Sequence, residues 1–383
     1  MQEERLMILK MIEDGKITTE EGLELLNALK EDPKQASKKE KKGPHSEEDA
    51  YQHTSRPSKS ENDQYVSRDV NWDAGGYRRT EEKVNTFARR FTEFVEDAVH
   101  KIKEFDLDFN FGSSVEVEHI FQHKHAKVTD VDVHVENGSI SFLPWDEEDI
   151  RMECHVKVYK VRDADEARRV FLNEVNFHFT DGKLAFEAKK KSMKVNTVMY
   201  VPRNQLEKIK LYAFNGKITG ENVSVDSFEA KTVNGRLDFD EIHANHVNLE
   251  TVNGTIAVPQ LHANKTDAKT VNGTVSVKTS KGDLDVETLN GTIHYTLLDE
   301  ASARVYLKTT TGSVNVQVPD NVKTEGELKT TVGGIQCELP EMSVIDEKNE
   351  FASKKMSFLA NKKAEAHFYV EAEATTGTIS IKN

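Results

Sequence analysis

The feature of this sequence that most constrains its fold is a short pattern, built around a glycine, that recurs between residues 138 and 377. The glycines of the pattern are Gly138, Gly216, Gly235, Gly254, Gly273, Gly291, Gly312, Gly333 and Gly377. From Gly216 to Gly333 they lie 18 to 21 residues apart. Self-similarity at a fixed period of this length is typical of stacked structural units, so we predict a repeat architecture rather than a single closed globule.

The residues around each glycine repeat with it. Two positions after the glycine every unit has an aliphatic residue: Ile140, Ile218, Leu237, Ile256, Val275, Ile293, Val314, Ile335 and Ile379. Five positions before it the residue is again apolar, and three positions before it is often Thr. Because side chains two apart in a strand share a face, each unit is predicted to be a strand, a corner and a second strand.

Six of the corners are Asn-Gly pairs. They are Asn137 with Gly138, Asn215 with Gly216, Asn234 with Gly235, Asn253 with Gly254, Asn272 with Gly273, and Asn290 with Gly291. Asn and Gly tolerate positive φ, and we expect that conformation at these corners. Asn-Gly is also the strongest short-range signal for a β-hairpin, so a meander of hairpins competes with a solenoid of parallel coils.

The residues four before the glycine, which we expect on the outer surface, discriminate between these folds. They are Lys231, Glu250, Lys269, Glu287 and Lys308, and their charges alternate from unit to unit. Alternation is expected when equivalent positions of successive coils lie about 4.8 Å apart, because like charges would repel and opposite charges attract. Lys329 breaks the alternation, and an exposed ladder would stabilise the fold little. The pattern favours a mainly β chain folded as a β-solenoid, parallel and β-helix-like, with coils of about 19 residues.

The N-terminal part of the chain differs from the repeats. Residues 1–32 are predicted to form a helical hairpin whose second helix has the apolar side chains Leu23, Leu26 and Leu29. A hairpin of this size buries too little surface to be stable alone, so it needs a partner within this chain or outside it. Residues 33–79 are rich in Lys, Ser and Pro, which predicts a flexible linker. The lysines at its start could contact an anionic membrane surface, although a solvated spacer is the simpler interpretation.

Residues 80–104 change to a helical period. Phe87, Phe91 and Phe94 lie on one side with other apolar residues, and charged residues fill the opposite side. We predict an amphipathic helix that packs this side on the β domain of residues 105–383 and caps one end of the solenoid, because open ends expose core and strand edges. At the other end the sequence runs onto a strand with no capping segment after it. Self-association through that end and a tolerated polar edge are both open.

The charge balance and the distribution of apolar residues limit the partners and the compartment. The chain has 66 acidic and 52 basic residues and a net charge of −14. A phosphate backbone favours a basic face, so nucleic acid is not an expected partner. No run of about 18 apolar residues occurs, and charges stand where a secretory signal peptide has its apolar segment. We therefore expect a cytoplasmic protein whose membrane contact is at most peripheral.

The sequence carries no catalytic signature that we can identify. The motifs GxSxG, HExxH, GxxxxGK[ST] and GxGxxG are absent. Three positions after the glycine, the outward column holds a lone Asp238, whereas glycoside cleavage needs a pair of carboxylates. Cys154 and Cys337 are too few for a disulfide framework or a four-cysteine metal site. We expect neither a catalytic residue nor a cofactor.

One group of histidines has a spacing that could suit a metal ion. His123 and His125 stand two apart on a predicted strand, where they could chelate one ion. No third ligand is identifiable, so partly exposed strand histidines are the simpler interpretation, and no metal site is predicted. His243, His246 and His262 fall in the variable far corner of the coils and are interpreted as loop residues.

Two segments carry a resemblance to a known family. The segment DGKITTEEGLELLNAL in the N-terminal hairpin resembles the SHOCT-like two-helix domain that opens proteins of the YvlB/LiaX family. The repeated T-V-N-G-x-[IVL] units resemble the C-terminal β-strand repeat domain of that family, which often carries an adhesin label. The resemblance implies a role in cell-envelope stress of Gram-positive bacteria, beside membrane proteins of the PspC type, and it implies no catalytic residues. The adhesin label leaves surface exposure by a non-classical route open.

These observations predict a non-enzymatic interaction or scaffold protein. The solenoid would be the binding platform, and the N-terminal hairpin would be a regulatory or recruiting module that engages its own solenoid, a membrane regulator or the envelope surface. The alternative is a carbohydrate-binding or carbohydrate-active β-helix, adhesin-like, that acts at the cell wall. That alternative requires a groove with clustered carboxylates or exposed aromatic side chains, and the repeat columns offer neither clearly.

Overall fold

The computed structural model describes residues 81–104, 112–203, 206–299, 301–350 and 353–383, and in the first of these ranges the side chains of residues 89–102. The chain divides into two compact units, Met1–Gly76 and Tyr77–Asn383, and all of the described residues belong to the second. The predicted hairpin of residues 1–32, the linker of residues 33–79 and the start of the predicted β domain, residues 105–111, lie outside the described residues.

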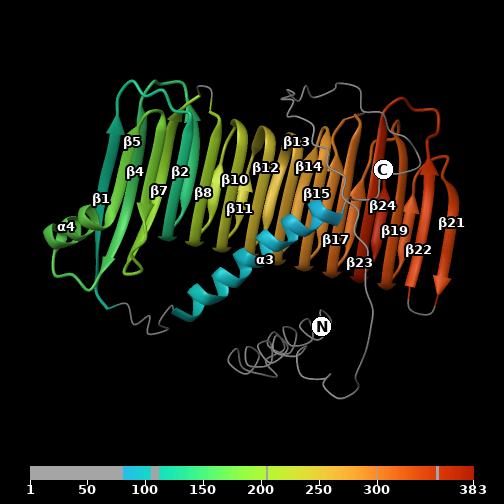
Figure 1. Ribbon diagram of the computed structural model, residues 1–383, viewed down its shortest axis with the longest axis horizontal. Coiled ribbons are helices and arrows are strands. Elements are labelled where there is room, and N and C mark those ends of the chain that lie inside the picture. The colour runs from blue at the N-terminus through green and yellow to red at the C-terminus, as the bar shows by residue number, and fades with distance from the viewer. Residues whose placement is uncertain (1–80, 105–111, 204–205, 300, 351–352) are drawn as a thin grey trace, which may run out of the picture. The chain divides into compact units, whose positions relative to one another are not determined.

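The second unit is a stack of parallel β-coils that antiparallel strands extend at both ends (Figure 1). Each coil has one strand before a corner and one strand after it, and the corner contains a glycine in every coil except that of β6 and β7, where residues 189–192 form it. In spatial order the coils are β6 and β7 (Lys183–Ala188, Met193–Pro202), β2 and β3 (Asp130–Asn137, Ile140–Trp145), β8 and β9 (Lys208–Asn215, Ile218–Gly220), β10 and β11 (Val223–Asn234, Leu237–Phe239), β12 and the first part of β13 (Glu241–Asn253, Ile256–Asn272), the second part of β13 and β14 (Val275–Thr279), β15 and β16 (Gly282–Asn290, Ile293–Leu297), β17 and β18 (Ala303–Thr311, Val314–Gln317), β23 and β24 (His367–Thr376, Ile379–Lys382), and β19 and β20 (Lys323–Val332, Ile335–Glu338).

The register between neighbouring coils confirms the predicted solenoid. Ile256 pairs in parallel with Leu237 in one neighbouring coil and with Val275 in the other, and all three side chains are fully buried. The strands before the corner form one layer, the strands after it form the second, and the aliphatic columns meet between them as the core. Because equivalent strands of successive units run parallel, the alternative of a hairpin meander is wrong.

The corner glycines are required by the close approach of neighbouring coils. A Cβ atom on Gly254 would lie 1.7 Å from the carbonyl oxygen of Gly235. That oxygen accepts a hydrogen bond at 3.1 Å from Oγ1 of the buried Thr251, which explains the Thr that precedes the corners. The Asn side chains form a ladder, in which Asn253 Nδ2 donates to Asn234 Oδ1 at 2.9 Å. The expected positive φ occurs at Gly138, Gly312, Gly333 and Gly377 but not at the five Asn-Gly corners from Gly216 to Gly291, where glycine is needed for space.

The last coil in the sequence is not the last coil in space. Strands β23 and β24 lie between β17/β18 and β19/β20 and run parallel to both pairs. The expectation that the solenoid ends on this strand is therefore wrong. The end is formed instead by β22 (Ser353–Ala360) and β21 (Ser343–Glu350), which continue the sheet antiparallel from β19 (Figure 1). The outermost strand, β21, exposes Val344 and Ile345 among charged side chains.

The opposite end of the stack carries antiparallel strands and a short helix. Strand β4 (Ile150–Tyr159) pairs with β7, β1 (Ser114–His123) pairs with β4, and β5 (Val175–Thr180) pairs with β6. Helix α4 (Ala164–Glu174) begins at Asp163, whose carboxylate accepts from the backbone N–H of Glu166 at 2.8 Å. Phe171 of α4 is fully buried, with its ring 6.1 Å from that of Phe121. This contact closes the apolar core at this end.

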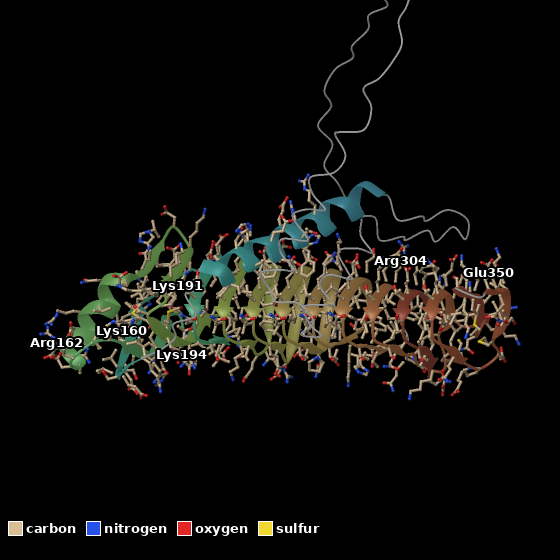
Figure 2. The ribbon with its side chains drawn as sticks, turned by 90° about the horizontal axis from the view of Figure 1, so that it is seen from below. Lys160, Arg162, Lys191, Lys194, Arg304 and Glu350 are labelled. Atoms are coloured by element: carbon tan, nitrogen blue, oxygen red, sulfur yellow. The ribbon has the colours of Figure 1, made fainter. Side chains whose placement is uncertain are left out.

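The amphipathic helix expected over residues 80–104 is α3 (Glu81–Glu104), and it does not cap the stack. Figure 2 shows α3 lying along one face of the coils, while Arg162, just before α4, and Glu350, on β21, mark the two ends. Amphipathicity alone predicts that one side of the helix is buried, but it does not say against which surface. Neither of the described helices is long and apolar enough to cross a lipid bilayer.

Candidate interaction face

The outer surface of the coils is apolar where α3 crosses it. Two positions before the corner glycine, outward side chains form a column of Phe214, Val233, Val252 and Val271. The first three are at most 6% exposed although they point away from the core between the layers. Ala98 of α3 is buried against them, and Phe94 and Val95 pack on the same cluster. The column therefore receives the apolar side of the helix.

The charged column four positions before the glycine runs beside this apolar column. Lys231 Nζ lies 3.1 Å from Glu250 Oε2, and Lys269 Nζ lies 3.3 Å from Glu287 Oε2. Glu250 and Lys269 are each 1% exposed, so the ladder is buried here, whereas the sequence predicted a solvent-exposed column. Glu250 also accepts from Asn248 Nδ2 at 3.0 Å. Buried charges are stable in a protein interior when they are paired and hydrogen-bonded in this way.

We refer to the residues of these two columns under α3 as the helix-covered face. They are Tyr212, Phe214, Lys231, Val233, Glu250, Val252, Lys269 and Val271. The face changes character further along the stack, where the ladder residues Lys308 and Lys329 have side chains 54% and 52% exposed. The same repeat pattern therefore produces a buried ladder beneath α3 and an exposed ladder beyond it.

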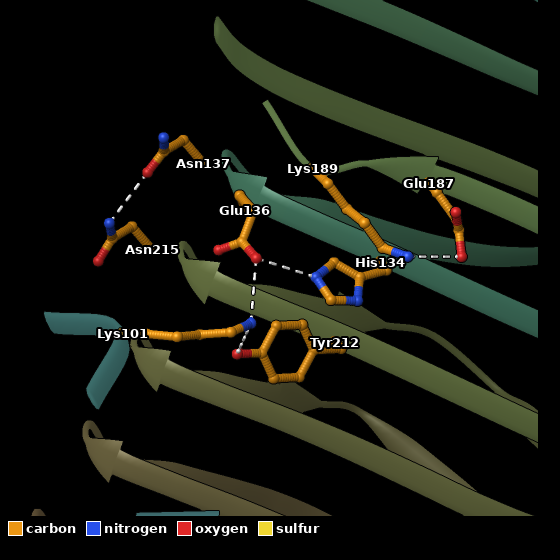
Figure 3. A network of polar contacts seen from close by, with 8 residues as sticks. All are labelled: Lys101, His134, Glu136, Asn137, Glu187, Lys189, Tyr212 and Asn215. Atoms are coloured by element: carbon orange, nitrogen blue, oxygen red, sulfur yellow. Dashed lines mark hydrogen bonds and ion pairs between the residues drawn. The ribbon is translucent and has the colours of Figure 1, made fainter. Parts of the chain in front are cut away.

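A polar network fastens the C-terminal part of α3 to the coils (Figure 3). Lys101 Nζ donates to Glu136 Oε1 at 3.0 Å and to the Tyr212 hydroxyl at 3.3 Å. Glu136 is 6% exposed, and the same Oε1 lies 3.2 Å from His134 Nε2. The rings of His134 and Tyr212 are in contact, with their centroids 4.5 Å apart and their planes tilted by 44°. Lys101 thus links α3 to two neighbouring coils, those of β2 and β8.

The network shifts the pKa values of its members. Burial alone would raise the pKa of Glu136, but hydrogen bonds from His134 and Lys101 outweigh it and hold the pKa below its ordinary value. Burial alone would lower the pKa of Lys101, but the charges and hydrogen bonds of Tyr212 and Glu136 raise it above its ordinary value. Both shifts favour the charged forms, so the ion pair persists at neutral pH.

Of the six residues that the sequence predicted for partner binding, two have side chains that the structure describes. Phe94 packs on the helix-covered face, with its ring centroid 5.6 Å from Lys231 Nζ, and Phe91 lies 6.3 Å from Phe94 and is half-buried. The side chains of Phe87, Leu23, Leu26 and Leu29 lie outside the described residues. A role of these six residues in binding a second molecule stays a prediction.

His123 and His125 do not lie on one strand. Strand β1 ends at His123, whose ring lies 4.6 Å from that of Phe179. His125 lies beyond the strand with φ of +53°, and its Nδ1 is 3.2 Å from Glu148 Oε2. The strand geometry on which chelation by the pair depended is therefore absent.

The histidines interpreted as loop residues lie on strands. His243 and His246 belong to β12 and His262 to β13, and His243 pairs in register with His262. Their spacing of 19 residues, which equals the repeat period, is the sequence signal that could have placed them side by side. Cys154 is buried and Cys337 is half-buried, and this burial raises the pKa of both thiols to about 12.

Comparison with known proteins bears on both parts of the chain. The profile of the Toastrack DUF4097 family matches residues 128–382, and the profile of a SHOCT-like domain matches residues 3–34. The chain is 37% identical over 385 aligned positions to the uncharacterized protein YvlB of Bacillus subtilis strain 168, and the alignment covers 100% of this chain and 99% of that protein.

Two solved bacterial proteins also match a part of this chain. A protein described as a putative adhesin from Bacteroides fragilis is 10% identical, with a TM-score of 0.40, and the match covers 69% of this chain and 97% of that chain. A protein described as a putative cell adhesion protein from Clostridium sporogenes is 13% identical, with a TM-score of 0.20, over 70% of this chain and 99% of that chain.

Proposed function

Because this chain belongs to the Toastrack DUF4097 family and matches YvlB over its full length, we propose that it is a non-enzymatic interaction scaffold of the bacterial cell-envelope stress response. The observation that carries the proposal is the seating of an amphipathic helix on the helix-covered face. The repeats present outward apolar side chains at one position and alternating charges at a neighbouring position. A surface of this kind fits helices that have an apolar side flanked by charges.

The contact with α3 supports a platform that can recognise helices. The apolar part of the contact is small, with Ala98 as its buried residue and Phe94 and Val95 at its rim. The polar part is specific, because Lys101 must reach Glu136 and Tyr212 at the same time. Apolar contacts supply most of the binding energy at such a surface, and charged contacts select the register of the partner.

The N-terminal SHOCT-like domain is proposed to recruit the partner. Its predicted apolar stripe of Leu23, Leu26 and Leu29 fits a groove or a second helix pair, and the linker of residues 33–79 would keep it close to the coils. We expect the partner to be a membrane regulator of the PspC type and the protein to act at the cytoplasmic side of the membrane. The net charge of −14 disfavours direct adhesion to an anionic bilayer, so contact with lipid would be peripheral.

A capture experiment tests the proposal. The full chain, a chain lacking residues 1–32 and a Leu26→Asn/Leu29→Asn chain are used as baits in membrane extracts, and retained proteins are identified by mass spectrometry. We expect a membrane regulator that the full chain retains and that both altered chains lose. A Lys59→Asn/Glu61→Asn chain, changed in the linker, is the matched control and should retain it.

The thermal unfolding of the β domain decides between recruitment and a structural role. If the Leu26→Asn/Leu29→Asn chain loses its partner with an unchanged transition, the hairpin recruits. A lowered transition would mean that the hairpin only stabilises the fold. Retention of wall polysaccharide by the full chain, with no membrane protein retained, would favour the carbohydrate-binding alternative and overturn the proposal.

A further inference from the structure

A cluster of metal-ligand types lies at the corner of the coils opposite the Asn-Gly ladder. His243 on β12 and His262 on β13 pair in register in adjacent coils, and their rings stack with centroids 4.5 Å apart and planes within 8°. Glu241 precedes His243 by two residues and points to the same side of the strand. The three side chains therefore come from two neighbouring coils.

The atoms that could bind an ion converge. Glu241 Oε1 lies 2.8 Å from His243 Nε2 and 3.8 Å from His262 Nε2, and no two of the three ligand atoms are more than 4.8 Å apart. Zinc holds imidazole nitrogen at about 2.0–2.1 Å, which sets the ligand atoms of a tetrahedral site about 3.3 Å apart, so the three separations here need to change by at most about 1.5 Å. The side chain of His243 is 50% exposed, and it can tilt out of the stack without losing core contacts.

A fourth residue fixes the orientation of one imidazole. His262 Nδ1 lies 2.7 Å from Oγ of Ser280, which is 8% exposed and lies in the next coil. When Nδ1 carries the proton and donates it to this hydroxyl, Nε2 is the unprotonated nitrogen and presents its lone pair toward Glu241. Outer hydrogen bonds of this kind orient metal-binding histidines in known metalloproteins.

We propose that Glu241, His243 and His262 form a binding site for a divalent first-row transition metal such as Zn²⁺. Two imidazole nitrogens and one carboxylate oxygen suit Zn²⁺, Ni²⁺ or Cu²⁺, whereas Mg²⁺ and Ca²⁺ prefer oxygen ligands throughout. Three protein ligands leave one tetrahedral position open, and the exposure of His243 puts that position in contact with solvent. The bound ion would join adjacent coils, and the open position would accept a ligand atom from a second molecule.

The test is isothermal titration of the full chain, without an affinity tag, with Zn²⁺. We expect one site per chain whose affinity falls at least 100-fold in His262→Ala and in His243→Ala. Removing the outer hydrogen bond with Ser280→Ala should weaken binding by about 10- to 100-fold. His246→Ala is the matched control, because His246 lies on the same strand and pairs with Lys265 instead. Its affinity should equal that of the unchanged chain.

The folding of each variant is compared by thermal unfolding in EDTA, where the transitions should coincide. In the unchanged chain Zn²⁺ should raise the transition, and in His262→Ala it should not. An affinity that is unchanged in both His243→Ala and His262→Ala would overturn the proposal, as would an equal loss in His246→Ala. If a single alanine variant unfolds in EDTA, the Ser280→Ala titration decides, and an unchanged affinity there counts against the site.

Discussion

The Nζ atom of Lys329 lies 3.1 Å from Oε1 of Glu373, a residue 44 positions further along the chain. Glu373 also faces Lys308, with Oε2 3.8 Å from that Nζ. The coil of β23 and β24 thus places a carboxylate between two lysines that follow one another in the sequence pattern. The alternation of charge that Lys329 interrupts in the sequence is unbroken in space.

This order of coils predicts which engineered cysteines form a disulfide. Lys329 and Glu373 pair in register on adjacent parallel strands, and such positions lie about 4.8 Å apart, within the range that a disulfide spans. We expect Lys329→Cys/Glu373→Cys to oxidise readily under mild conditions, as judged by non-reducing electrophoresis of proteolytic fragments. The control Lys308→Cys/Lys329→Cys places the thiols two coils apart, roughly 10 Å, and should stay reduced. A disulfide in Lys308→Cys/Lys329→Cys and none in Lys329→Cys/Glu373→Cys would mean that the coils stack in the order of the chain.

The close approach of neighbouring coils at the corners predicts that alanine substitutions at Gly254 and Gly334 have very different effects on stability. Gly254→Ala places a methyl group 1.7 Å from the carbonyl oxygen of Gly235, so neighbouring coils must separate. We expect it to lower the free energy of unfolding by about 3 kcal/mol or more, measured by chemical denaturation. Gly334→Ala, whose nearest neighbouring atom would be 3.9 Å away, should change it by less than about 0.5 kcal/mol. Equal effects of the two substitutions would contradict this account of the corner.

The aliphatic column predicts that the effect of an introduced charge on stability depends on which face of the strand carries it. Ile256 is fully buried between Leu237 and Val275, so Ile256→Asp would place an unpaired charge in the core. We expect a loss of at least about 3 kcal/mol of stability, or a chain that does not fold, by denaturant titration and circular dichroism. Ser276 lies in the adjacent coil with its side chain outward, and Ser276→Asp should fold normally. A folded Ile256→Asp chain of ordinary stability would be incompatible with the buried column.

The Lys101–Glu136 pair predicts that α3 is held most firmly at intermediate pH. The pKa of Glu136 is lowered from 4.5, so its contribution to stability is present above 4.5 and is lost as pH falls through the lower value of the folded protein. The pKa of Lys101 is raised from 10.5, so its contribution is present below 10.5 and is lost as pH rises through the folded value. A double-mutant cycle of Lys101→Met and Glu136→Gln measures the coupling.

We expect a coupling energy of about 1 kcal/mol at pH 7 that falls progressively as the pH is lowered below 4.5, obtained from urea denaturation at each pH. The pair Arg89 and Glu93, which is largely exposed within α3, is the control. Its coupling should be a few tenths of a kcal/mol at pH 7. A coupling between Lys101 and Glu136 that does not change with pH would mean that the two side chains interact through packing rather than charge.

The repeat, its register and its core were predictable because they depend on local rules. A buried column such as Leu237, Ile256 and Val275 follows from the alternation of side chains along a strand and from a constant period. The sign pattern of Lys231, Glu250 and Lys269 was enough to separate parallel coils from hairpins. These features need no information about contacts that are distant in the sequence.

The features that the sequence did not reveal depend on contacts that are distant in the sequence. The sequence around Glu373 does not indicate that its coil lies between those of Lys308 and Lys329. The only indication in the sequence is that Lys329 follows Lys308 in the charged column without an acidic residue between them. The apolar side of α3 predicted burial, but the partner surface is built from Phe214, Val233 and Val252, each from a different coil. His243 and His262 were assigned to loops because the far corner varies in sequence, although their spacing matches the period.

The position of the coil of β23 and β24 affects how the chain folds during its synthesis on the ribosome. Strand β19 emerges first and meets the open edge of β17 while its eventual neighbour is not yet made. Stacking there would set Lys329 directly against Lys308, and like charges on adjacent strands disfavour pairing. We expect Lys329→Glu, which removes this repulsion, to refold with an added slow phase in stopped-flow fluorescence, and an unchanged refolding time course would refute the idea. We therefore expect the repulsion between Lys308 and Lys329 to keep the edge of β17 unpaired until β23 has been translated.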